Sequence, residues 1–356
     1  MHFSIPMCAA LLLALAISLG QTVPSVAGVT NPNISVIGNT LIQMVDDPAD
    51  PNHGRPQLSF EEAEVIFDDY LNPFARGTFV LAFSDEGAEV EEAFFDIVRG
   101  LPMGLGLRVG KFRQDFGRLN PLHPHAYSFI AVPAMLQAYM PGEESFNDVG
   151  ISLSDLIALG PVAATISGTV LSGATFLAEE DSSAESRLGW NLRWRNFVTL
   201  GGRNSLEFGA SATSGVSEPQ YGMKTSLFGL DFKSKIYTAS ANYFTLQGEW
   251  ISLSKDSDDG SGTGTIETFK PSGFYLAADF TQGRMYGGLK LENFQEVAAG
   301  TSTMSSMGIY GGIGLLEEST LFRFLIENVK PAGVDAFNRY MVQAVFSMGP
   351  HKAHQF

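Results

Sequence analysis

The chain contains a single cysteine, Cys8, among its 356 residues. Cys8 lies in an N-terminal segment that we expect to be removed, so the mature chain would have neither a disulfide framework nor a cysteine nucleophile. Histidine is also scarce, with six residues. Barrel lipases and proteases need a histidine beside a serine or an aspartate, and no strand-like segment carries a histidine at its centre. The sequence therefore predicts no enzymatic activity and no cofactor.

Charged residues make up only 17% of the chain, below the roughly 25% of an average soluble domain. No run is nevertheless apolar enough to be a confident membrane helix. Residues 156–178 carry no charge and are long enough to span, but Gly160-Pro161 interrupts them and Thr and Ser alternate through them, which favours a hairpin. Residues 119–142 contain four prolines, which forbid a regular helix, and we interpret them as a long, ordered, aromatic loop.

The formal net charge is −16. The acidic excess lies largely in segments expected to be loops, such as Asp46-Asp47 and Glu179-Glu180-Asp181. Such a surface disfavours nucleic acid as a partner. It would suit divalent ions near an outer leaflet, although solubility of exposed loops is the plainer interpretation.

Residues 8–19 form an apolar core and are followed by small residues at Ser25, Ala27 and Gly28. This pattern predicts a secretory signal peptide over residues 1–28, cleaved near residues 25–30. The segment departs from the usual form because residues 1–7 contain no Lys or Arg. Cys8 precedes the apolar core, which argues against a lipoprotein.

From about residue 34 the chain alternates apolar and polar residues in segments of roughly ten. In residues 188–195, Leu188, Trp190, Leu192 and Trp194 alternate with polar residues or glycine. Residues 206–213 and 274–281 follow the same pattern. Residues i and i+2 share one face of a strand, so each segment has one apolar and one polar side. A soluble sandwich has the same period, and the connections therefore decide between the two.

We predict sixteen strands, at residues 34–43, 60–71, 76–84, 89–99, 103–114, 148–157, 162–173, 187–196, 203–214, 222–233, 241–254, 272–282, 285–296, 304–316, 319–330 and 337–348. Tight turns alternate along most of the chain with long polar loops at 115–147, 174–186, 255–271 and 297–303. This arrangement is typical of an all-β, transmembrane antiparallel β-barrel with short periplasmic turns and long external loops. The barrel is predicted over residues 29–348, followed by a tail at 349–356 with no separate second domain.

Several short segments resemble those of a family of Gram-negative outer-membrane porin-like proteins. They are Asn31-Pro-Asn-Ile-Ser-Val-Ile-Gly38, Val90-Glu-Glu-Ala-Phe94, Gly110-Lys-Phe-Arg113, Phe116-Gly-Arg-Leu-Asn-Pro-Leu-His-Pro-His125 and Gly349-Pro-His-Lys-Ala-His354. Members are described as resembling phosphate-selective porins, and some are labelled zinc-regulated outer-membrane receptors. The resemblance implies an outer-membrane channel or uptake barrel without naming its solute.

The predicted last strand is amphipathic and the chain ends in Phe356. A terminal aromatic residue after such a strand resembles the signal read by the outer-membrane assembly machinery, although residues 349–355 separate the two here. The expected partners are this machinery, outer-membrane lipid and lipopolysaccharide. A homotrimer is expected by analogy with large porins alone.

The loop at residues 115–147 is the first candidate for a functional site. If it folds into the barrel it narrows the pore, whereas an external lid or a trimer contact is the alternative. The charged side chains that would then set the field at a constriction are Arg113, Arg118, His123, His125, Glu143 and Glu144.

Five further arginines fall on the faces of predicted strands that point away from lipid: Arg108, Arg193, Arg195, Arg323 and Arg339. A charge facing lipid near the midplane costs about 2–4 kcal/mol, so these side chains should point into the lumen. They could form a basic ladder for anions. The favoured alternative is mixed ion pairs with the acids Glu207, Asp231, Glu249, Asp279, Glu292 and Glu327, which leaves the selectivity open.

His123-x-His125 and His351-x-x-His354 contain four of the six histidines. Together they could hold zinc, but a loop after the fifth strand should be external and the tail periplasmic, so the pairs are not expected to meet. Family-specific packing is the favoured alternative to a metal site at His123 and His125.

The sequence as a whole predicts an outer-membrane porin that passes small polar solutes or ions by passive diffusion. A ligand- or metal-specific receptor or uptake channel is one alternative. A non-conducting structural barrel is the other.

Overall fold

The computed structural model describes residues 32–142, 145–177, 187–258, 266–297, 302–315 and 319–350. The chain divides into two units, Met1–Pro32 and Asn33–Phe356, and the second contains every strand described below. The predicted signal peptide, Glu143, Glu144, the two tail histidines and Phe356 lie outside the described residues.

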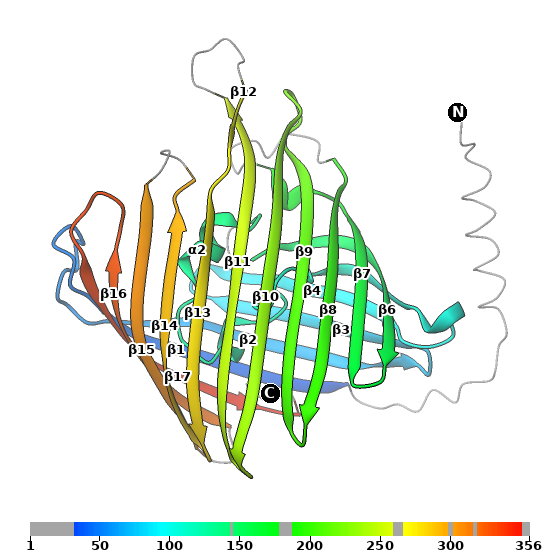
Figure 1. The fold of residues 1–356 in the computed structure, drawn as a ribbon, viewed down its shortest axis with the longest axis horizontal. Coiled ribbons are helices and arrows are strands. Elements are labelled where there is room, and N and C mark those ends of the chain that lie inside the picture. Colours follow the sequence, from blue (N-terminus) through cyan, green and yellow to red (C-terminus); the bar gives the residue numbers. More distant parts are fainter. Residues whose placement is uncertain are drawn as a thin grey trace. The chain divides into compact units, whose positions relative to one another are not determined.

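The second unit is a single antiparallel sheet closed on itself (Figure 1). Each strand pairs with its neighbour in sequence, except that β12 and β13 both pair with β11, and β1 pairs with both β2 and β17. The strands are β1 Asn33–Val45, β2 Gln57–Asn72, β3 Ala75–Ser84, β4 Gly87–Ile97, β5 Gly106–Arg113, β6 Asn147–Leu159, β7 Val162–Leu171, β8 Gly189–Gly201, β9 Asn204–Glu218, β10 Met223–Ala239, β11 Asn242–Asp258, β12 Ile266–Phe269, β13 Ser272–Gln282, β14 Met285–Gln295, β15 Thr303–Leu315, β16 Thr320–Lys330 and β17 Phe337–Met348.

The short strand β12 and the strand β13 act as one barrel strand. Both pair with β11, one after the other, and only Lys270 and Pro271 separate them. Proline has no N–H to give to the ladder, which accounts for the interruption. The result is the predicted closed barrel of sixteen antiparallel strands.

Each predicted strand span corresponds to one observed strand, and 272–282 and 337–348 agree at both ends. The predicted loop at 255–271 is partly wrong, because β11 continues to Asp258 and β12 pairs with it. The predicted start at residue 103 is also wrong, since Pro102–Gly104 form a 3-10 helix. Met103 and Gly104 have φ of 61° and 76°, a left-handed conformation that a strand does not use.

The residues that alternate along each strand point alternately into the barrel and out of it. Along β16 the inward residues Leu321, Arg323 and Leu325 are at most 2% exposed, while Phe322 and Phe324 on the outer face are more than 40% exposed. The predicted apolar faces of β8 and β17 likewise lie outside. Because charges on a lipid-facing surface are costly, this places the apolar band outward and the arginines inward.

Residues 114–146, between β5 and β6, contribute a 3-10 helix, Pro124–Ala126, and a short helix α2, Ala134–Tyr139. Among the described residues, no helix is both long and apolar enough to cross a membrane. The segment packs against inward-facing side chains of the wall, and we call it the inner loop.

Candidate functional site: the lumen and its inner loop

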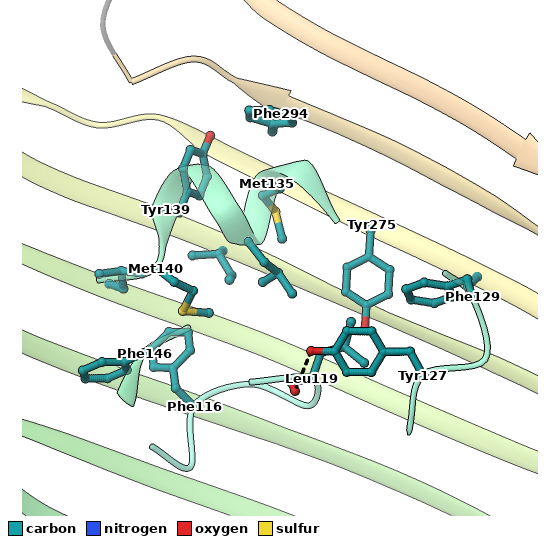
Figure 2. Packing of buried hydrophobic residues seen from close by; sticks show 14 of the residues in the cluster. Phe116, Leu119, Tyr127, Phe129, Met135, Tyr139, Met140, Phe146, Tyr275 and Phe294 are labelled. Carbon is teal, nitrogen blue, oxygen red and sulfur yellow. Dashed lines mark hydrogen bonds between the residues drawn. The ribbon is translucent and has the colours of Figure 1, made fainter. Parts of the chain in front are cut away.

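The inner loop is held by an aromatic cluster that reaches across to the wall (Figure 2). The ring of Phe129 meets Tyr275 of β13 and Tyr310 of β15 edge to face, at centroid distances of 6.0 and 5.7 Å. Tyr139 of α2 meets Phe294 of β14 in the same way at 5.9 Å. Edge-to-face pairs at these distances add attraction beyond the burial of apolar area, so the loop has a defined seat.

The loop enters the lumen at Gly117, where its backbone lies against the wall. Gly117 N donates to Ser211 Oγ at 2.9 Å and Leu119 N donates to Glu249 Oε1 at 2.8 Å. Tyr275 also donates to Glu249 Oε1 at 3.0 Å, which fixes that carboxylate. Gly117 has φ of +62°, and a Cβ there would lie 2.1 Å from Glu249 Oε2. Only glycine fits this approach.

Helix α2 is anchored at both ends. Its first turn follows Pro133, and Met135 N donates to Glu292 Oε1 at 2.6 Å. At the other end the Tyr139 hydroxyl donates to the carbonyl oxygen of Gln295 at 2.6 Å. The Glu292 carboxylate therefore accepts one of the N–H groups that a helix leaves unpaired at its start. The helix fits between Pro133 and Pro141, the two prolines that exclude a longer one.

The predicted lumen arginines are largely paired. Arg193 forms an ion pair with Asp231, its Nη2 lying 2.9 Å from Asp231 Oδ1. Arg339 Nη2 lies 2.5 Å from Glu327 Oε2. Arg323 donates instead to Gln343 Oε1 at 2.7 Å and to the backbone oxygen of Tyr127 at 2.5 Å. Arg193 and Arg339 therefore have acidic partners, whereas the partners of Arg323 are neutral.

The other predicted basic residues are spread over the lumen. Arg118 Nη1 lies 3.2 Å from Glu207 Oε2, and Arg108 Nε lies 2.7 Å from Asp96 Oδ1. Arg113 is buried and pairs with Glu91. Arg195 lines the larger of the two cavities described below. These residues do not gather into one ring, and Glu143 and Glu144 lie outside the described residues.

Two of the cavities among the described residues are lined by residues of the inner loop. The larger has a volume of about 800 Å³ and a mixed charged lining that includes Arg76, Asp96, Arg108, Asp155 and Arg195. The smaller, of about 440 Å³, is strongly basic. Its basic lining residues are Arg118, Arg203, Lys233, Lys235 and Arg284, and Asp279 is the only acid among its described lining residues.

His123 and His125 lie together beside glutamates of the wall. Their Nδ1 atoms are both 3.1 Å from Glu64 Oε1, and His123 Nδ1 is 3.4 Å from Glu91 Oε2. The imidazole rings are stacked with centroids 5.6 Å apart. Burial opposes protonation of His123, but the carboxylates of Glu64 and Glu91 outweigh it and raise its pKa to about 10.

Sequence reasoning missed the acidic half of this cluster and the basic cavity. Glu62 and Glu64 are two residues apart in a predicted strand, so the rule that placed the arginines inward applies to them as well. Lys233 ends the predicted strand 222–233, and Lys235 lies beyond it because β10 continues to Ala239. Glu91 and Glu92 are adjacent, and alternation alone cannot turn both inward.

Comparison with known sequences gives one partial match and no family. No family model matches the chain. An uncharacterized protein of Aquifex aeolicus (strain VF5) is 28% identical over 210 residues, which are 53% of this chain and 44% of that protein. The aligned part thus spans less than half of that relative's length.

Among solved structures, the outer-membrane channel DcaP of Acinetobacter baumannii matches with a TM-score of 0.61 at 11% identity, over 89% of this chain and 96% of that one. The anion-selective porin from Comamonas acidovorans matches with a TM-score of 0.59 at 13% identity, over 88% and 98%. The chain therefore has the fold of outer-membrane porins.

Proposed function

We propose that this protein is a porin of a Gram-negative outer membrane that lets small polar solutes or ions cross by passive diffusion. The observation that carries the proposal is the closed sixteen-stranded barrel with a charged interior and a cavity of about 800 Å³ beside its inner loop. An apolar outside with a polar lumen is the arrangement of barrels that conduct. The solved structures of similar fold include proteins called a channel and a porin.

The route runs through the space between the inner loop and the wall, and the loop sets the size limit. Along this route the paired charges Arg108–Asp96 and the exposed Arg195 face the solute. Rings and pairs of charge in a narrow lumen select ions by their field. Arg113, the last residue of β5, and Arg118 of the inner loop hold the start of the loop in position through Glu91 and Glu207. The route needs neither a covalent step nor a cofactor.

We further propose a homotrimer embedded in lipid and lipopolysaccharide. OmpT of Vibrio cholerae, with a TM-score of 0.58 at 9% identity over 89% of this chain and 98% of that one, is described in a trimer form. The outer-membrane assembly machinery would recognise the amphipathic strand β17 and Phe356.

Planar-bilayer conductance of the full chain, refolded in detergent, tests the proposal. We expect stepwise channels, and steps in groups of three would support the trimer. A gel showing heat-modifiable, folded barrel is the necessary control. A silent bilayer from folded protein would overturn diffusion and favour a non-conducting barrel, while flux that saturates and requires one ligand would favour a specific receptor.

A further inference from the structure

Two irregular strands, β2 and β4, bring Glu62, Glu64, Glu91 and Glu92 to one place on the inner wall. The pairing of β1 with β2 shifts register between Asn39 and Thr40, so that Glu61 is the extra residue of a bulge next to Glu62. The pairing of β3 with β4 shifts between Val80 and Leu81, where Glu91 is the extra residue beside Glu92. Bulges re-aim side chains and occur often beside functional sites. Here the two bulges lie next to the glutamates that contact His123 and His125.

The cluster carries an excess of acid in a buried position. Glu64 is 1% exposed and His125 is 3% exposed. Arg113 binds Glu91 through its guanidinium and Glu92 through its backbone N–H. Among the described residues, Glu64 Oε2 has no hydrogen-bond donor although it is fully buried. Buried charge is normally paired or bound to a metal. A divalent cation that replaces the proton of His123 would supply more positive charge to these carboxylates.

The distances within the cluster suit a metal ion. Zinc binds nitrogen and carboxylate oxygen at about 2.0–2.2 Å in a tetrahedron, so its ligand atoms lie about 3.3–3.6 Å apart. His123 Nδ1 lies 3.1 Å from Glu64 Oε1 and 3.4 Å from Glu91 Oε2. Glu64 belongs both to a triad with His123 and Glu91 and to one with His125 and Glu62.

We infer that Glu64, Glu91 and His123 bind one divalent transition-metal cation of the zinc class, with His125 beside them on Glu64. Imidazole nitrogen with carboxylate oxygen suits zinc and its neighbours, whereas calcium and magnesium prefer oxygen ligands alone. Arg113 would orient Glu91 from outside the ligand set. The ion would fasten the inner loop to β2 and β4, the part of the wall that the aromatic cluster does not reach. This inference does not depend on whether the barrel conducts.

Isothermal titration of the full, chelator-stripped chain with zinc chloride in detergent at pH 7.5 tests the inference. We expect one zinc per chain, with equal concentrations of magnesium or calcium failing to compete. Glu64→Gln keeps the side chain's shape and should weaken binding by more than the roughly 10- to 100-fold that follows loss of an outer-shell partner. Zinc should also raise the melting temperature of the wild type but not of this variant.

Two matched controls locate the site. Glu207→Gln removes a lumen carboxylate that pairs with Arg118 and lies outside the cluster, and it should leave zinc affinity unchanged. His351→Ala with His354→Ala removes the tail histidines and should also leave it unchanged. If the stripped wild type takes up no zinc, or if Glu64→Gln and His123→Ala bind as well as the wild type, the site does not exist. The wild-type titration decides the question even if a variant fails to fold.

Discussion

At the scale of single residues, Gly117 meets two requirements at once, as Gly110 and Gly173 also do. Its backbone is left-handed, and its missing side chain leaves room for Glu249. That carboxylate cannot move aside without losing the bonds from Leu119 N and the Tyr275 hydroxyl. The inner loop can enter the lumen at this point only because residue 117 has no Cβ.

Gly117→Ala is therefore expected to destabilise the folded barrel. The left-handed backbone costs an L-residue about 1–2 kcal/mol, and forcing a methyl group against Glu249 adds about 1–3 kcal/mol. Urea unfolding of the refolded protein, followed by tryptophan fluorescence, measures the sum.

Gly283→Ala is the matched control. Gly283 has φ of +60°, but nothing lies within 4 Å of the Cβ that would be added. It should show the backbone cost alone. Equal decreases in the free energy of unfolding of the two variants would mean that the Glu249 side chain moves aside at little cost. The contact at Gly117 would then not constrain where the loop enters the lumen.

At the scale of elements, the inner loop behaves as a small core seated on the wall of the barrel. Phe129 is fully buried between two wall tyrosines, while the sixteen strands pair independently of it. Loss of the seat should thus release the loop and leave the barrel intact.

Phe129→Ala tests this separation. Truncating a buried phenylalanine costs about 3–5 kcal/mol, which should raise the open fraction of the loop at least about a hundredfold. Limited proteolysis of the folded protein should cut within residues 114–146 much faster, and single-channel conductance should increase.

Phe322→Ala provides the comparison, because Phe322 lies on the outer face of β16 and is 43% exposed. It should alter neither the cleavage of the loop nor the conductance. Unchanged proteolysis in Phe129→Ala would contradict a loop held by its aromatic contacts.

The sequence predicted the elements well and their interior contacts poorly, for a physical reason. Alternation and turn residues are local, so the sixteen strands and the inward side of Arg193 and Arg323 could be predicted from them. The positions of the bulges at Glu61 and Glu91 depend on the register between neighbouring strands. The sequence of one strand does not determine that register. The position of the inner loop depends on contacts between residues more than 150 positions apart in the sequence, such as that of Met135 with Glu292.

At the scale of the whole molecule, the lumen is uneven in charge. The larger cavity mixes acids and bases, whereas five basic residues line the smaller one with a single acid among its described residues. A net charge of −16 for the chain thus coexists with a locally basic interior. If ions pass the smaller cavity, anions should pass more easily.

Lys233→Gln with Lys235→Gln should shift the reversal potential in a salt gradient toward cation preference. The shift should be larger near 10 mM salt, where the screening length is about 30 Å, than near 1 M, where it is about 3 Å. Lys330→Gln, which removes an exposed lysine at the end of β16, should leave the potential unchanged. An unaltered potential in the double variant would show that the permeating ions bypass this cavity.

The inner loop contacts residues far along the sequence, and this limits how early in folding it can take its final position. Tyr127 is bonded to Arg323, a partner 196 residues further along the chain. Closing such distant contacts is slow because the entropy of ordering the intervening chain comes first. Strands β9 to β16 must join before every anchor of the loop exists, so we expect a nascent barrel to pass through a stage in which the loop does not yet narrow the lumen. The inner loop would then narrow the lumen late in folding, after the strands that carry its anchors have paired.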